Sequence, residues 1–136
     1  MAANRTINVG DKAFSVRLGW NAVRRIEEVL HEPVQAIGLR MVLGQAGLRE
    51  LGTVFWAGLE TARIKDKSRP QPYTLEEVGD IIDEMDADVF FEQVYPQLIE
   101  AITEAFPTVK KAAADKKGSG TGDPPPAAPA GTGTAS

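Results

Sequence analysis

The chain has 136 residues, of which 43 % are hydrophobic and none is cysteine. This length favours one compact domain over two, and the lack of cysteine excludes disulfides, thiolate zinc sites and thiol nucleophiles. The residues after position 107 include four lysines and two aspartates and so carry a charge of +2. Because the whole chain carries −4, residues 1–107 carry −6. An acidic body disfavours nucleic acid as a partner.

No segment reaches the roughly 18 consecutive apolar residues that a membrane span needs. The first residues are followed by polar and apolar alternation, not by the apolar stretch of a signal peptide. We therefore expect a soluble protein of the cytoplasm, without a membrane partner.

Residues 5–18 predict a β-hairpin. Ile7 and Val9 alternate with polar neighbours, Gly10-Asp11 supplies a two-residue turn with glycine first, and Phe14 and Val16 resume the alternation. A two-stranded ribbon alone is marginal in water, so we expect helices to cover this apolar side.

Two short helices are predicted next. Asn21 is the predicted N-cap of the first, which runs to about Leu30 and includes Trp20 in its apolar stripe. His31-Glu32-Pro33 ends this helix, and Pro33 opens the second, which breaks at the glycines of 44–47.

A third helix over about 48–64 is apolar around most of its circumference, which is typical of a central helix. Gly52 and Gly58 are predicted to let neighbouring backbones come close. The charged and proline-containing segment 65–72 is predicted to be a loop and an internal hinge.

Thr74-Leu75-Glu76-Glu77 has the Thr-x-x-Glu form of a capping box and predicts the start of a fourth helix. Asp86-Ala87-Asp88 is predicted to cap a last helix, which carries Phe91 on its apolar stripe, is kinked or divided at Pro96 and ends at Pro107.

The chain beyond Val109 holds no further large apolar residue and is rich in Ala, Gly and Pro, so it is predicted to be disordered. The predicted fold is mainly α (α+β). An N-terminal β-hairpin packs on a bundle of four to five short helices in residues 1–107, and residues 108–136 form a disordered tail.

Reactive groups are sparse along the chain. His31 is the single histidine and lies where a helix ends, and the acidic run 76–92 places Phe90 and Phe91 where a calcium loop needs an oxygen ligand and a glycine. We therefore predict no catalytic residue, no cofactor-binding residue and no metal site. The acidic run is interpreted as a solvated helix face, with the docking of a basic partner segment as the functional alternative.

The aromatic residues supply the candidates for partner binding. Neighbours in a helix point about 100° apart, so one core face does not easily bury both members of Phe55-Trp56 or of Phe90-Phe91. Either each helix is surrounded, or one member of a pair is exposed as an anchor for a partner. Tyr95 would extend such a surface, and the candidates are Phe55, Trp56, Phe90, Phe91 and Tyr95.

The order of these features resembles the tail assembly chaperones of long-tailed phages and of phage-derived gene transfer agents. The resemblance covers about residues 7–106. It rests on the hairpin Ile7–Leu18, the helix start Asn21-Ala22-Val23 with Ile26-Glu27, and the segment Phe55-Trp56-Ala57-Gly58-Leu59. Trp20 is bulkier than the family leads us to expect.

The resemblance implies a protein that is not an enzyme and that binds the long helical tape measure protein. It would keep this client soluble while tail tube subunits polymerise around it. In many relatives a longer product of ribosomal frameshifting recruits the tail tube protein. The resemblance also implies a role in the host cell cytoplasm and absence from the mature particle.

Two further interpretations remain. A structural virion connector or tail-completion protein would use the hairpin to add strands to a neighbour's sheet. A small regulatory nucleic-acid-binding domain would use Arg17, Arg24, Arg25 and Arg63, which the acidic balance disfavours. The sequence leaves a homo-oligomer open.

Overall fold

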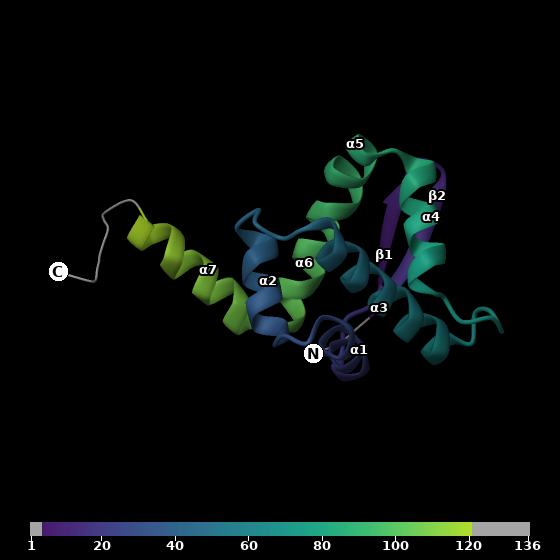
Figure 1. Cartoon of the computed structure of the whole chain (residues 1–136), viewed down its shortest axis with the longest axis horizontal. Helices are drawn as coiled ribbons and strands as arrows, with labels where there is room; N and C mark the ends of the chain where they lie inside the picture. Colours follow the sequence, from purple (N-terminus) through teal and green to yellow (C-terminus); the bar gives the residue numbers. More distant parts are fainter. Residues whose placement is uncertain (1–3, 121–136) are drawn as a thin grey trace.

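The computed structural model describes residues 4–120 and confirms a mainly helical fold with an N-terminal hairpin (Figure 1). The strands β1 (Asn4–Val9) and β2 (Lys12–Arg17) form a two-stranded antiparallel sheet. The helices that follow in order are α1 (Trp20–Leu30), α2 (Val34–Val42), α3 (Leu48–Asp66), α4 (Leu75–Met85), α5 (Ala87–Val89), the π-helix η1 (Phe90–Val94), α6 (Tyr95–Ala105) and α7 (Pro107–Gly120).

The hairpin follows the predicted alternation. Gly10 turns the chain with a φ of 60°, and the register pairs Ile7 with Phe14 and Val9 with Lys12. Facing residues lie on the same side of an antiparallel pair, so this side carries Ile7, Val9 and Val16, which are buried. The side packs on α3, as predicted.

The two outer edges of the hairpin differ. Gln97 of α6 accepts a hydrogen bond from the backbone N–H of Asn8 (3.4 Å) and donates one to its carbonyl (3.3 Å). Gln93 of η1 accepts a bond from the N–H of Gly10 (3.3 Å). The outer edge of β2 has no strand beside it among the described residues, and Ala13 and Ser15 on it are exposed.

Helix α3 is the central helix that the sequence predicted, and Phe55 and Leu59 in it are fully or almost fully buried. A Cβ added at Gly58 would lie 2.9 Å from the Cβ of Val16, so this glycine lets β2 approach α3. The same expectation was wrong for Gly52, because a Cβ added there would meet no atom within 4 Å.

Two expectations about α1 were also wrong. The N-cap is Gly19, so Asn21 lies within the first turn and its side-chain oxygen accepts a bond from Arg24 (3.4 Å). Trp20 is 79 % exposed and does not belong to the buried stripe, which consists of Ala22, Ile26 and Leu30. The bulk of Trp20 is therefore directed to the surface and does not disturb helix packing.

The last predicted helix is helical without a break from Ala87 to Ala105, but it contains a π-helical turn directly before Pro96. The π-helix η1 lies directly before α6, and the N–H of Tyr95 bonds to the carbonyl of Phe90, five residues back. The wider turn relieves the clash of a proline ring with the carbonyl four residues earlier. The buried stripe here contains Phe90, not the predicted Phe91, followed by Val94 and Leu98.

Helix α7 was not predicted, because residues 108–136 were assigned to a disordered tail. Pro107 opens this helix instead of ending the fold, and the helix packs on α2 and α6 before it extends from the body (Figure 1). Val109 is buried, and a Cβ added at Gly38 would lie 3.2 Å from both of its methyl groups. Residues 121–136 of the predicted tail lie outside the described part of the chain.

Candidate functional site

A groove opens between α3 and α4, and it is the clearest candidate for a functional site. On one side it is lined by Val29 of α1 and by Leu48, Gly52 and Thr53 of α3. On the other side it is lined by Leu75, Gly79 and Ile82 of α4. Its volume is about 370 Å³, within the range of roughly 300–1,000 Å³ common for binding pockets. We call it the α3–α4 groove.

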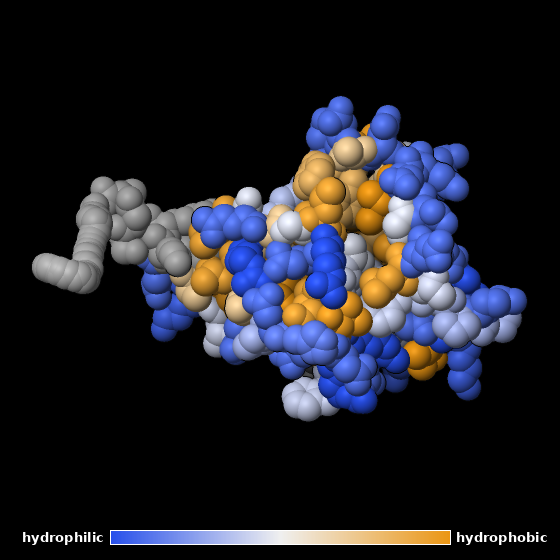
Figure 2. Space-filling view, in the orientation of Figure 1, coloured by the Kyte–Doolittle hydropathy of each residue, from blue (hydrophilic) through white to orange (hydrophobic). Residues whose placement is uncertain are grey.

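The groove is open and apolar. Phe90 is 1 % exposed and forms its floor, whereas Leu48 and Leu75 are 69 % and 42 % exposed at its margins. Gly52 and Gly79 add no side chain to the walls, and a Cβ added at either would meet open space. Figure 2 shows apolar residues gathered beside α4 and over the arm from α5 to α6, with hydrophilic residues around them.

The fourth helix carries a narrow buried face. Val78 is buried, but Ile81, Ile82 and Met85 are half-buried, although all lie at the helical spacing that the sequence showed. Thr74 accepts a hydrogen bond from the N–H of Glu77 (3.0 Å), which confirms the predicted N-cap. The apolar stripe of α4 is therefore correctly predicted but incompletely covered.

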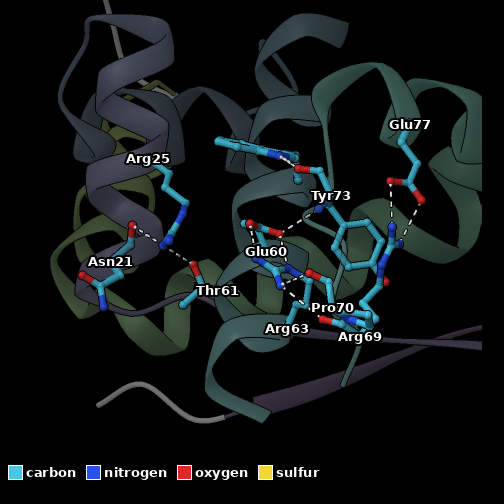
Figure 3. A network of polar contacts seen from close by, with 10 residues as sticks. Asn21, Arg25, Glu60, Thr61, Arg63, Arg69, Pro70, Tyr73 and Glu77 are labelled. Carbon is cyan, nitrogen blue, oxygen red and sulfur yellow. Dashed lines mark hydrogen bonds and ion pairs between the residues drawn. The ribbon is translucent and has the colours of Figure 1, made fainter. Parts of the chain in front are cut away.

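A polar network fixes the loop before α4 and so positions one wall of the groove (Figure 3). The carboxylate of Glu60 accepts two bonds of 2.7 Å from Arg63 and one of 2.8 Å from the N–H of Tyr73. The indole N–H of Trp56 donates to the carbonyl of Tyr73 (2.8 Å). The predicted loop 65–72 begins later than expected, because α3 extends to Asp66. Arg63 of α3 donates to the carbonyls of Arg69 (3.2 Å) and Pro70 (3.5 Å) and so joins this loop to α3.

Arg69 continues this network to α4. Its guanidinium lies 4.2 Å from the ring centroid of Tyr73 and donates to both carboxylate oxygens of Glu77, at 2.9 and 3.2 Å. The carboxylate of Glu77 is engaged there, so the hydroxyl half of the predicted capping box forms and the carboxylate serves the loop instead.

The pKa of Glu60 reflects its place in the network. Burial acts to raise this pKa, but the hydrogen bonds from Arg63 and from the N–H of Tyr73 outweigh burial and lower the pKa below its usual value. Glu60 is therefore a buried carboxylate held in its charged form, and its role in the structure is to join the loop to α3.

The structure separates the five aromatic candidates. Phe55 and Phe90 are core residues, and Trp56 and Tyr95 are half-buried with their polar atoms bonded inside the fold. Phe91 is 42 % exposed and packs edge-on against Phe90 and Tyr95, with centroid distances of 5.5 and 6.0 Å. Of the five, Phe91 has the largest exposed fraction.

Sequence reasoning missed Leu48 and Leu75 as accessible residues. Each begins a helix at a position that periodicity assigns to an apolar stripe, and no single-helix pattern reveals how far a neighbouring helix covers it. The usable signal was the pair of glycines, since Gly52 and Gly79 shorten both walls at the level of the groove.

His31 is exposed and ends α1 with a φ of 57°, its N–H bonded to the carbonyl of Glu27 (2.8 Å). Within residues 4–120, no group of three or more His, Cys, Asp or Glu side chains has the arrangement of a metal site. No helix in the same range is long and apolar enough to cross a membrane.

Comparison with protein-family models, curated proteins and solved structures finds no match to this chain.

Proposed function

We propose that this chain is an assembly chaperone for phage tails, which binds and solubilises the tape measure protein during tail tube assembly and catalyses no reaction. The resemblance of residues 7–106 to such chaperones supports the proposal. The structural observation that supports it most is the α3–α4 groove, whose apolar margins at Leu48 and Leu75 stay accessible. Covering apolar surface is worth about 25 cal/mol per Å², so a client with its own exposed apolar residues gains by docking there.

The wider proposal follows from this role. The protein acts in the host cell cytoplasm, cooperates with the tail tube protein and is absent from the mature particle. Nucleic acid is not part of the proposal, because all four candidate arginines donate hydrogen bonds within the fold. Arg63 donates to Glu60, Arg25 to Thr61 (3.1 Å), Arg17 to Asn4 (3.1 Å) and Arg24 to Asn21 (3.4 Å).

A second candidate function is a structural connector in the virion, and the open edge of β2 favours it. The β1 edge is covered by Gln93 and Gln97, whereas β2 presents exposed Ala13 and Ser15 along its outer side. An uncovered edge is a template for strand addition. Mass spectrometry of purified particles separates the two functions, because a connector is retained in them and a chaperone is not.

Co-expression with the tape measure protein of the same gene cluster tests the main proposal. We expect the tape measure protein to move from the insoluble to the soluble fraction and to co-purify with this chain. An unrelated acidic protein of similar size serves as the control. Continued aggregation of the tape measure protein in the presence of this chain would contradict the proposal.

A further inference from the structure

We propose that the α3–α4 groove binds an amphipathic helix that carries lysine or arginine along one side of its apolar stripe. The inference rests on the proposed function, since it names the chemistry of the client segment that docks on the chaperone. Three observations carry it: the walls of the groove are helical, glycines shorten these walls, and one rim is acidic.

The walls of the groove favour a helical occupant. They come from α1, α3 and α4, whose backbone N–H and C=O groups are mostly bonded within each helix. An extended peptide would find no strand edge in the groove, and its own backbone groups would lose water without gaining partners. A helix satisfies those groups internally and needs only an apolar surface to dock.

Gly52 and Gly79 favour close approach of such a helix. Neither glycine has an atom within 4 Å of the place where a Cβ would lie, so both leave space that faces the groove. The separation of packed helices is set by the side chains at their contact, and glycine allows the shortest separations. Leucine or alanine side chains of the incoming helix would fill the space above Phe90.

The charge of the rim defines one side of the occupant. Every charged residue from Glu76 to Glu104 is acidic. Glu76, Asp80 and Asp83 stand at helical spacing beside the groove-lining residues of α4 and are exposed; we call them the acidic stripe. Among the described residues none of the three forms an ion pair.

Part of the acidic stripe works against the helix that carries it. Glu76 lies in the first turn, where the helix dipole favours negative charge, but it repels Asp80 at i,i+4, and Asp83 lies in the last turn of α4, where the dipole disfavours negative charge. Such an arrangement is relieved when positive charge from outside lies along it. A second copy that docks through its own α4 is a poor occupant, because it would bring its own acidic stripe to the same rim.

The opposite rim sets the orientation of the charges. Arg49 lies there and donates to the carbonyl of Val29 (3.3 Å). Positive residues of the occupant are therefore expected on the α4 side of its apolar stripe and not on the α3 side. A peptide with lysines on a single flank should therefore bind more tightly than one with lysines on both flanks, because lysines on the second flank would face Arg49.

Two synthetic helical peptides of about 20 residues test the proposal, since shorter helices are marginal in water. Both carry leucine and alanine on one face; one has lysine along one flank of this face and the other has glutamate at the same positions. Fluorescence anisotropy is expected to show binding of the lysine peptide to the full chain and at least about tenfold weaker binding of the glutamate peptide. Equal binding of both would overturn the proposal.

Gly79→Leu tests the place of binding, with Gly79→Ala as its matched control. Both changes are expected to leave the fold intact, because helix propensity improves and nothing lies within 4 Å of the added Cβ. Gly79→Leu fills the groove and should weaken binding of the lysine peptide by about tenfold or more, whereas Gly79→Ala should change it much less. Unchanged binding to Gly79→Leu would place the peptide elsewhere and overturn the proposal.

The charge requirement has its own variants. The double change Asp80→Lys and Asp83→Lys should weaken binding of the lysine peptide strongly, since like charges now face each other. Asp11→Lys with Asp115→Lys makes the same change in net charge on the hairpin turn and on α7, and should leave binding near that of the wild type. Equal losses in the two double variants would show that net charge alone matters.

The alternative occupant and the proposed function are tested separately. Sedimentation could show that the wild type is a dimer and that Gly79→Leu is a monomer. In that case a second copy would be the occupant, and the helix proposal would be overturned. In co-expression, a tape measure protein solubilised equally by wild type and Gly79→Leu would end the groove inference but leave the chaperone function. If the wild type failed to solubilise the tape measure protein but still bound the lysine peptide in the groove, the chaperone function would be contradicted and the groove inference would stand.

Discussion

The two sides of α3 are built from similar residues but differ in how fully they are closed. On the hairpin side, Gly58 is covered by Val16, and the ring of Phe55 packs edge-on against Phe14 with centroids 5.7 Å apart. On the α4 side, Gly52 faces open space and Leu48 is largely exposed. Within the same helix, Gly58 therefore makes a close contact with β2, whereas Gly52 lines the α3–α4 groove.

The difference teaches that closure depends on the element opposite and not on the apolar character of α3. The hairpin is held against the body by side chains at both ends: Arg5 pairs with Glu100 (3.0 Å) and Glu104 (2.5 Å), and Gln97 brackets Asn8. Helix α4 is fixed mainly at its start, by the network around Glu60. The rest of α4 leaves its apolar stripe half-covered, and the groove results.

The largest expected contrast comes from removing one apolar side chain on each side. Phe55→Ala empties a fully buried position and should lower the free energy of unfolding by about 3–5 kcal/mol. Leu48→Ala removes an exposed side chain and should change it by no more than about 0.5 kcal/mol. Chemical denaturation followed by circular dichroism measures both, and a large loss from Leu48→Ala would mean that the groove is closed in solution.

The two glycines of α3 give the next contrast. Gly58→Ala forces the backbones of α3 and β2 apart and should cost about 1–3 kcal/mol despite better helix propensity. Gly52→Ala meets no atom and should stabilise the protein by roughly 0.5–1 kcal/mol. Thermal unfolding of the two single variants measures both effects. Stability changes of the same sign would contradict the difference between the closed side and the open side of α3.

Glu60→Gln tests the network that positions α4. It removes the charge that Arg63 and the N–H of Tyr73 stabilise, and at neutral pH it should cost roughly 1–3 kcal/mol. The folded-state pKa of Glu60 is lowered, so its contribution is complete above the unfolded-chain pKa of about 4.3 and is lost as the pH falls through the folded-state pKa. The stability gap between wild type and Glu60→Gln should therefore narrow on acidification; a constant gap would argue against an ionised Glu60.

The hairpin and the central helix could be predicted from the sequence because each has a strong periodic pattern. Ile7, Val9 and Val16 alternate, and Phe55 and Leu59 lie in a helix that is apolar on nearly every side. Such patterns report the average environment of an element. They do not report which member of an adjacent pair is buried. In the π-helix η1, Phe90 lies in the core and Phe91 does not.

Single contacts were beyond the reach of sequence reasoning. Composition assigned residues after 107 to a tail, yet Val109 is buried beside Gly38, where the missing side chain makes room for α7. The α3–α4 groove is a case of the same kind. It depends on how far α4 lies from α3, which the loop network sets and no local pattern encodes.

The smallest expected effects concern the fastening of α4 itself. Thr74→Ala removes the N-cap and should cost about 1 kcal/mol, whereas Glu77→Gln weakens a half-exposed ion pair with Arg69 and should cost about 0.5 kcal/mol or less, decreasing further in high salt. Hydrogen exchange of the α4 amides is the sensitive readout, because both variants should speed exchange there while the amides of α3 around Phe55 keep their protection. If exchange rose equally in both helices, α4 would open only together with the core. The two sides of α3 would then form one cooperative unit and not a closed side and an adjustable one.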